Sequence, residues 1–265
     1  MHKILLSLAI AAPLVAQEHI AVPLADASRP VTLSVHVLSG SITVRGYNGR
    51  EVLVDSKGTS SSTRHDKDAA SHEGMHRIDA GASDLTIESE NNKVSIASRG
   101  GRGADVTIQT PVNSSLNVKT LNGGQIIIEG VSGEIEAQDL NGAVTVRNVS
   151  GSVVAHSLNG AVTVSLANAK SGSPMSFTSL NGTIDVTLPA NIAADFSMKT
   201  NHGEIYSDFD VKLKSPPAPK VEASDSKKGK YKVHTESAVV GSVNGGGPEF
   251  QFRTMNGNIY IRKPK

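Results

Sequence analysis

Apolar residues follow many glycines of this chain at two fixed positions. After Gly142 they are Val144 and Val146, with the polar Thr145 between them. Strict alternation of this kind predicts short β-strands that bury one face. The same spacing recurs after six further glycines: Gly40, Gly133, Gly151, Gly160, Gly182 and Gly257.

A third apolar residue stands two positions before each of these glycines, which makes the repeating unit apolar-x-Gly-x-apolar-x-apolar. Because apolar residues of a regular repeat gather in the core, we expect all three positions to fill one thin aliphatic interior. The residues before the glycines are Leu38, Val131, Leu140, Val149, Leu158, Leu180 and Met255.

The heptamer LNGAVTV occurs at 140–146 and again at 158–164. Val-Ser-Gly and Leu-Asn-Gly alternate around it, so the full period is about eighteen residues. This predicts an all-β fold, a β-solenoid with about 18–20 residues per coil, because stacked coils place like residues above one another. The alternative is an antiparallel β meander or sandwich, with Asn-Gly turns along one edge.

The asparagines of the repeat predict a structural ladder. Asn and Gly tolerate the backbone angles of tight turns, and stacked amides can hydrogen-bond along a coil axis. We therefore assign a turn or ladder role, and no catalytic role, to Asn122, Gly123, Asn141, Gly142, Asn159, Gly160, Asn181, Gly182, Asn256 and Gly257.

Composition supports an aliphatic all-β chain. Aromatic residues make up 3% of the sequence, tryptophan and cysteine are absent, and no long stretch shows a helical period. The lack of cysteine excludes disulfides, thiolate metal sites and the acylated cysteine of a bacterial lipoprotein.

The first residues resemble a secretory signal peptide. Lys3 precedes an apolar run from Ile4 to Val15, which is too short to span a bilayer, and Ala16 is a suitable cleavage point. We expect residues 1–16 to be removed and residues 17–265 to form a single exported β-repeat domain. That domain would be periplasmic or extracellular, and either soluble or held to the envelope non-covalently.

Charge gives no sign of a nucleic-acid or lipid partner. Without Lys3 the chain carries 25 basic and 25 acidic residues, and no basic stripe follows from the sequence. The densest cationic segment, Lys227 to Lys232, is expected to be a solvated loop. It belongs to one of two loop excursions from the coils, at 57–75 and 213–236.

Three segments resemble the DUF4097 family of adhesin-like bacterial β-strand-repeat proteins. They are SGSITVRGYNGREVLVDSK (39–57), HRIDAGASDLTIESENNKVSI (76–96) and the run DVTIQTPVNSSLNVKTLNGG through LNGAVTV (105–146). The resemblance implies a β-helix-like repeat domain that faces the envelope and carries no established catalytic residues. The chain departs from the family pattern at 213–236.

Two motifs suggest metal sites. His72-Glu73-Gly74-Met75-His76 matches H-E-x-x-H, but Gly74 and the polar flanks do not form the helix that this zinc motif requires. His65, His72 and His76 are weak metal candidates, and we expect no bound metal. Residues 100–105 match the start of a calcium-binding repeat, but such sites need tandem copies.

Four acids suggest glycoside chemistry. Glu134 and Glu136 share one strand face, and Glu129 and Asp139 lie close in sequence. Since Ile135 should point inward, both glutamates should point to water.

The sequence therefore predicts an exported, non-catalytic, adhesin-like binding or scaffolding module of the cell envelope, without a cofactor. Its expected partner is an envelope glycan or another envelope protein. The alternatives are a carbohydrate-active β-helix enzyme that uses the carboxylates, and a metal-binding protein that uses the histidines.

Overall fold

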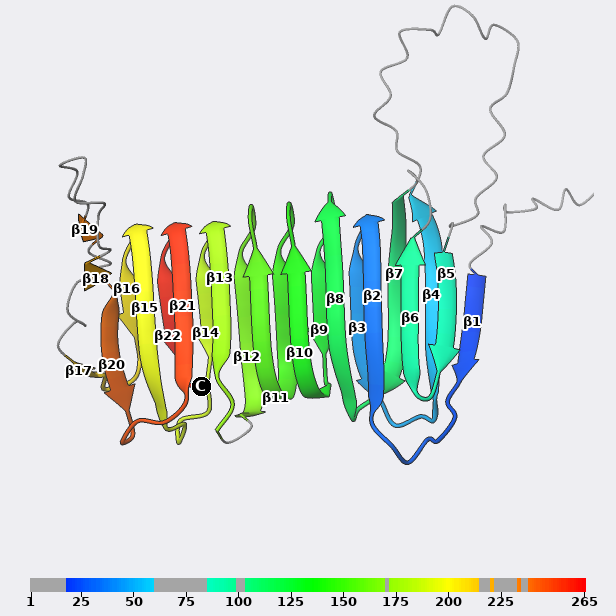
Figure 1. Cartoon of the computed structure of the whole chain (residues 1–265), viewed down its shortest axis with the longest axis horizontal. Helices are drawn as coiled ribbons and strands as arrows, with labels where there is room; N and C mark the ends of the chain where they lie inside the picture. The colour runs from blue at the N-terminus through cyan, green and yellow to red at the C-terminus, as the bar shows by residue number, and fades with distance from the viewer. Residues whose placement is uncertain are drawn as a thin grey trace, which may run out of the picture.

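The computed structural model describes residues 18–59, 85–98, 103–169, 172–214, 220–221, 233–234 and 238–265. This part of the chain contains strands and turns and no helix, so the all-β prediction is confirmed. The strands lie side by side in two layers along a rod (Figure 1). Residues 1–16 and most of the predicted loops at 57–75 and 213–236 lie outside the described residues.

Each layer has a fixed order of hydrogen-bonded strands. The front layer runs β5 (Leu85–Glu90), β6 (Lys93–Ser98), β2 (Val31–Ser39), β8 (Ser114–Asn122), β10 (Ser132–Asp139), the second half of β11 (Val144–Ser157), β13 (Met175–Asn181), β21 (Glu249–Asn256), β15 (Ala194–His202), β20 (Val239–Val243) and β17 (Lys212–Lys214).

The back layer runs β1 (Glu18–Pro23), β4 (Glu51–Thr59), β7 (Gly103–Pro111), β3 (Ile42–Tyr47), β9 (Ile126–Glu129), the first half of β11, β12 (Val162–Ala169), β14 (Ile184–Thr187), β22 (Ile259–Arg262) and β16 (Ile205–Ser207). A separate pair is formed by β18 (Lys220–Val221) and β19 (Val233–His234).

The middle of the rod consists of parallel windings. A front strand passes through a turn into a back strand, and each strand pairs in parallel with its counterpart in the next winding. Gly133 pairs with Gly151, 18 residues on, and Leu116 pairs with Ile135, 19 residues on. This is the register that stacked coils predict. Antiparallel pairing, which the meander alternative predicts, occurs at the two ends, where β1, β4 and β5 and then β20 and β17 cap the windings.

The windings do not follow one another in sequence order throughout. The winding β2–β3 lies between β6–β7 and β8–β9. The last winding of the sequence, β21–β22, lies between β13–β14 and β15–β16. Figure 1 shows this second insertion as the red strands β21 and β22 between the yellow-green β13 and β14 and the yellow β15 and β16.

The apolar residues after each glycine form the core, as predicted. Val144, Val146, Val162 and Ile184, for example, have no exposed surface. The core also contains an aromatic cluster that the repeat did not predict. Its rings lie 5.2 to 6.2 Å apart between centroids. The cluster comprises Phe177, Phe196, Phe209, Phe250 and Phe252, which are all five phenylalanines of the chain.

The prediction that every apolar residue before the glycines is buried is wrong. Val131 and Val149 are buried, but the residues of the Leu-Asn-Gly type point outward. In each such winding the side chain one position earlier, such as Ser157, points inward, so alternation turns the next residue to solvent. The exposed fractions are 47% for Leu38, 39% for Leu140, 37% for Leu180 and 42% for Met255, and Leu158 is partly exposed.

The glycines of the Leu-Asn-Gly turns allow the windings to touch. A Cβ atom on Gly142 would lie 1.7 Å from the carbonyl oxygen of Gly124, and one on Gly160 would lie 2.2 Å from that of Gly142. Gly is therefore required here by close backbone approach. In the neighbouring winding Gly124, and not Gly123, makes this contact, because a Cβ on Gly123 would meet nothing within 4 Å.

Candidate functional site

Three open hollows lie on the outward face of the front layer. Their volumes are about 340, 250 and 350 Å³. The first two share Val154, and the last two share Glu249 and Gln251. The hollows therefore adjoin one another in a line from Thr32 on β2 to Val240 on β20, and we call this line of hollows the trough.

The strand register produces this trough. Successive windings place their outward side chains in straight rows, and the central row consists of small or medium-sized residues. In the next row, the longer side chains of Lys199 and Arg253 border the hollow over β15 and β21. In spatial order the central row is Ser34, Asn117, Glu136, Val154, Ser176, Gln251, Ser197 and Val240.

The half of the trough over β8 and β10 contains a fixed carboxylate. Glu136 Oε2 accepts a hydrogen bond from Asn117 Nδ2 at 2.9 Å, and Oε1 accepts one from Gln138 Nε2 at 2.6 Å. Lys119 Nζ lies 3.4 Å from Oε1. Neighbours thus fix this side chain in one position. Asn117 Oδ1 is buried and has no hydrogen-bond partner among the described residues.

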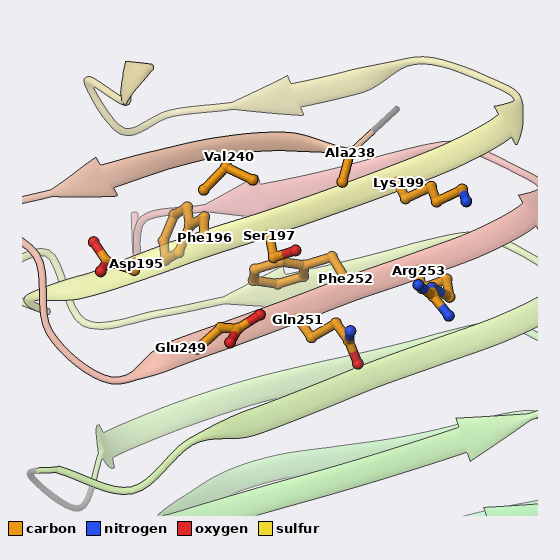
Figure 2. Close-up of a pocket in the computed structure, with 10 residues that line it drawn as sticks. All are labelled: Asp195, Phe196, Ser197, Lys199, Ala238, Val240, Glu249, Gln251, Phe252 and Arg253. Atoms are coloured by element: carbon orange, nitrogen blue, oxygen red, sulfur yellow. The ribbon is translucent and has the colours of Figure 1, made fainter. Parts of the chain in front are cut away.

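The half over β15, β20 and β21 separates its charges. Figure 2 shows Lys199 and Arg253 at one end of the hollow, Asp195 and Glu249 at the other, and Ser197 between them. Asp195 Oδ1 lies 2.8 Å from Nζ of Lys214 on the capping strand β17. The half of the trough over β15, β20 and β21 can therefore contact both cationic and anionic groups of a ligand.

The four acids that suggested glycoside chemistry do not converge. Glu134 and Glu136 line the trough and flank the buried Ile135, as predicted. Glu129 lies on the back layer, where it contacts Arg45 at 3.3 Å and Arg147 at 3.7 Å. Because Asp139 points into the interior, the constellation that the enzyme alternative requires is not formed.

Asp139 occupies a position at which other windings have a buried Ser or Thr, whose hydroxyl forms a hydrogen bond to a neighbouring winding. In other windings this position donates to the turn glycine of the preceding winding, as from Ser157 Oγ to the carbonyl of Gly142 at 2.8 Å. Asp139 is 2% exposed, and its Oδ2 has no hydrogen-bond partner in the described structure. Burial raises the pKa of this carboxyl above its ordinary value, opposed by the backbone N–H groups of Asn141 and Gly142.

The asparagines of the turns form a continuous chain of amide hydrogen bonds on the surface. Each Nδ2 donates to the Oδ1 of the preceding winding, and the chain continues through the inserted β21. The bonds run from Asn141 to Asn122 (3.2 Å), Asn159 to Asn141 (2.9 Å), Asn181 to Asn159 (2.8 Å) and Asn256 to Asn181 (2.7 Å).

Comparison with known proteins finds structural similarity at low sequence identity. No family model matches the chain, and no curated protein matches it. A "putative cell adhesion protein" from Clostridium sporogenes is 10% identical, with a TM-score of 0.46, over 94% of this chain and 100% of its own. A "putative adhesin" from Bacteroides fragilis is 9% identical, with a TM-score of 0.40, over 94% of this chain and 97% of its own. Membership in the DUF4097 family stays a prediction.

The metal candidates are not placed. His65, His72 and His76 lie outside the described residues, as do residues 100–102 of the segment 100–105. Asp105 is described, and its Oδ1 accepts a hydrogen bond from the backbone N–H of Ser41 at 2.7 Å. Where the chain is described, no group of three potential metal-ligating side chains occurs and no helix is long and apolar enough to cross a membrane.

Sequence reasoning missed most of the trough. The outward direction of Glu134 and Glu136 followed from alternation around Ile135. The pairing of Gln251 with Ser176 and Ser197 could not follow, because it depends on where β21 is inserted. The signal that could have shown the trough is the low volume of the outward residues on successive strands.

Proposed function

We propose that this protein is an exported, non-catalytic, adhesin-like module that binds or scaffolds an extended polymer at the bacterial cell envelope. The exported location rests on the predicted signal peptide at 1–16. The envelope setting rests on the resemblance to the DUF4097 family. An envelope glycan is the favoured partner, and a second envelope protein is the other.

The trough of adjoining hollows is the observation that carries the proposal. It crosses eight strands of the front layer, from β2 to β20. At a spacing of about 4.8 Å between strands, its length is roughly 34 Å. Small-molecule sites are enclosed and mostly apolar, whereas this trough is open and long. Its shape therefore suits a chain-like ligand that lies along the rod.

The lining suits a glycan. Hydroxyls of Ser152, Ser176 and Ser197 and the amides of Asn117 and Gln251 supply donors and acceptors for sugar hydroxyls. Val154 in the middle of the trough gives an apolar contact for the face of a sugar ring.

Binding to a panel of immobilised bacterial polysaccharides, with peptidoglycan included, tests the proposal. The double variant Ser152→Arg, Ser176→Arg fills the trough with long side chains, and we expect at least ten-fold weaker binding. The matched control, Thr145→Arg and Thr163→Arg on the back layer, should change binding less than two-fold. Equal weakening in both variants, or no binding to any polysaccharide by the parent protein, would contradict it.

A further inference from the structure

The outward leucines form a second continuous feature of the front layer. They occupy six consecutive windings, from β2 through β8, β10, β11 and β13 to β21. We call them the leucine stripe: Leu38, Leu121, Leu140, Leu158, Leu180 and Met255. At about 4.8 Å per winding, the stripe is straight and roughly 24 Å long. A contiguous apolar row of this length on a surface commonly marks an interaction site.

The charges beside the stripe are of one sign. The neighbouring row of outward side chains contains Lys119 and Arg253, continues to Lys199 on β15, and includes no acid on the six windings of the stripe. Lys119 also contacts Glu136, which lies one row further away, in the trough. On the other side of the stripe lie the neutral amides of the asparagine ladder. The row beside the stripe is His36, Lys119, Gln138, His156, Thr178 and Arg253.

The placement of the stripe does not favour a partner that fills a groove. None of its side chains lines the three hollows described above, and the row lies next to the turns. A peptide helix or strand that docks through apolar anchors needs a concave site or an open sheet edge. A straight apolar row with flanking cations instead matches a flat surface with an apolar layer beneath anionic groups.

We infer that the leucine stripe docks the protein onto a lipid surface that carries anionic headgroups. The leucines and Met255 enter the boundary between headgroups and acyl chains, and Lys119, Lys199 and Arg253 face the anionic headgroups. Such binding strengthens with buried apolar area and with electrostatic attraction. The stripe does not line the trough, although the flanking Lys199 and Arg253 also border the hollow over β15 and β21. The inference does not depend on the proposed glycan partner.

Vesicle sedimentation measures the docking. The experiment uses the chain from Gln17 onward, which retains every strand of the structure and lacks the apolar run 4–15 that could insert into lipid. We expect binding to vesicles of equal phosphatidylglycerol and phosphatidylcholine, and at least ten-fold weaker binding to phosphatidylcholine alone. The variant Lys119→Gln, Arg253→Gln should lose at least three-fold on the anionic vesicles.

The leucines are tested by the triple variant Leu140→Thr, Leu158→Thr, Leu180→Thr, which keeps residues suited to strands. It should bind anionic vesicles at least ten-fold more weakly. The matched control, Thr145→Ser, Thr163→Ser, Thr187→Ser on the outward side of the back layer, should stay within two-fold of the parent.

A fluorescent reporter keeps the test independent of stability. The chain has no tryptophan, so Leu140→Trp introduces a single one into the stripe and Thr145→Trp introduces one on the back layer. With anionic vesicles, the emission of the first should shift to the blue and be quenched by brominated acyl chains, and that of the second should not change.

Three results would overturn the inference: no binding of the parent protein to anionic vesicles, undiminished binding of the triple threonine variant, or an unshifted emission at position 140. A blue shift that rises with protein concentration in the absence of vesicles would also overturn it, because a second copy of the chain would then cover the stripe. Loss of polysaccharide binding alone would leave it intact.

Discussion

The two corner types of this rod share a sequence pattern and differ in structure. Val-Ser-Gly leads from the back layer to the front, and Leu-Asn-Gly leads from the front to the back. Val131 and Val149 at the first corner are 1% and 0% exposed, whereas Leu140 at the second is 39% exposed. An apolar residue two positions before a glycine is therefore not by itself a sign of burial.

Backbone conformation explains the difference. The residues before the two valines, Gly130 and Asn148, have φ angles of 67° and 50°. This left-handed conformation turns the chain before the valine, so the valine points inward. At the Leu-Asn-Gly corner no left-handed residue precedes the leucine, so the strand continues through it. The alternation of the strand then directs the leucine side chain to solvent. A single left-handed residue thus decides which side chains become core and which become surface.

The largest expected effect comes from filling the glycine contacts. Gly160→Ala should cost about 2–3 kcal/mol of unfolding free energy, because its Cβ would meet the carbonyl oxygen of Gly142. Gly151→Ala should cost about 1–2 kcal/mol more, since it combines a similar contact with a φ of 126°. Urea unfolding measures both. Gly123→Ala, with no close contact, is the control and should cost about 1 kcal/mol.

The valine and leucine of the two corners should respond differently to truncation. Val149→Ala removes buried methyl groups and should cost about 2 kcal/mol. Leu158→Ala removes more atoms but from a partly exposed site, and should cost less than about 1 kcal/mol. Thermal and urea unfolding of the pair provide the measurement. An equal loss of stability in the two variants would refute the distinction between the corners.

Asp139 at the Leu-Asn-Gly corner predicts a pH-dependent effect. Because burial raises its pKa in the folded protein, the folded state holds the proton more tightly than the unfolded chain does. Stability from this group is therefore present below its unfolded pKa, near 3.9, and is lost as the pH rises through the folded value. Asp139→Ser, which restores the usual hydroxyl, should raise the unfolding free energy at pH 7 by roughly 1–3 kcal/mol.

That gain should shrink as the pH is lowered toward 4, because the raised pKa makes the native carboxyl take up its proton before the unfolded chain does. Urea unfolding of variant and parent at both pH values gives the difference, and other carboxyls cancel in the comparison. The same gain at pH 7 and pH 4 would show that ionisation of Asp139 is not its cause.

The smallest effect concerns the polar residue of each corner. Asn159→Ala removes one bond to Asn141 and one from Asn181, and should cost about 1 kcal/mol because both bonds are exposed. Ser150→Ala at the other corner should change the unfolding free energy by less than about 0.5 kcal/mol. A Tm comparison of the two alanine variants checks this order, and a larger loss for Ser150→Ala would reverse it.

Much of the fold followed from local alternation, and the remainder depended on distant pairing. The burial of residues such as Val144 and Ile184 required only a period of two. The position of β21 between β13 and β15 was not predictable, since Asn181 pairs with Asn256 across a separation that no local pattern records. Of the trough, only Glu134 and Glu136 could be assigned an outward direction, because their intervening Ile135 was clearly apolar.

The last two strands of the sequence, β21 and β22, join two windings that precede them in the chain. A ribosome, or a secretion channel, delivers residues 194–207 before residues 249–262, yet among the described strands β16 pairs with β22 alone. The rod therefore cannot assemble from one end to the other as the chain emerges, and completion waits for the last winding. A premature stop before Glu249 would open a gap inside the column, and would not simply shorten it.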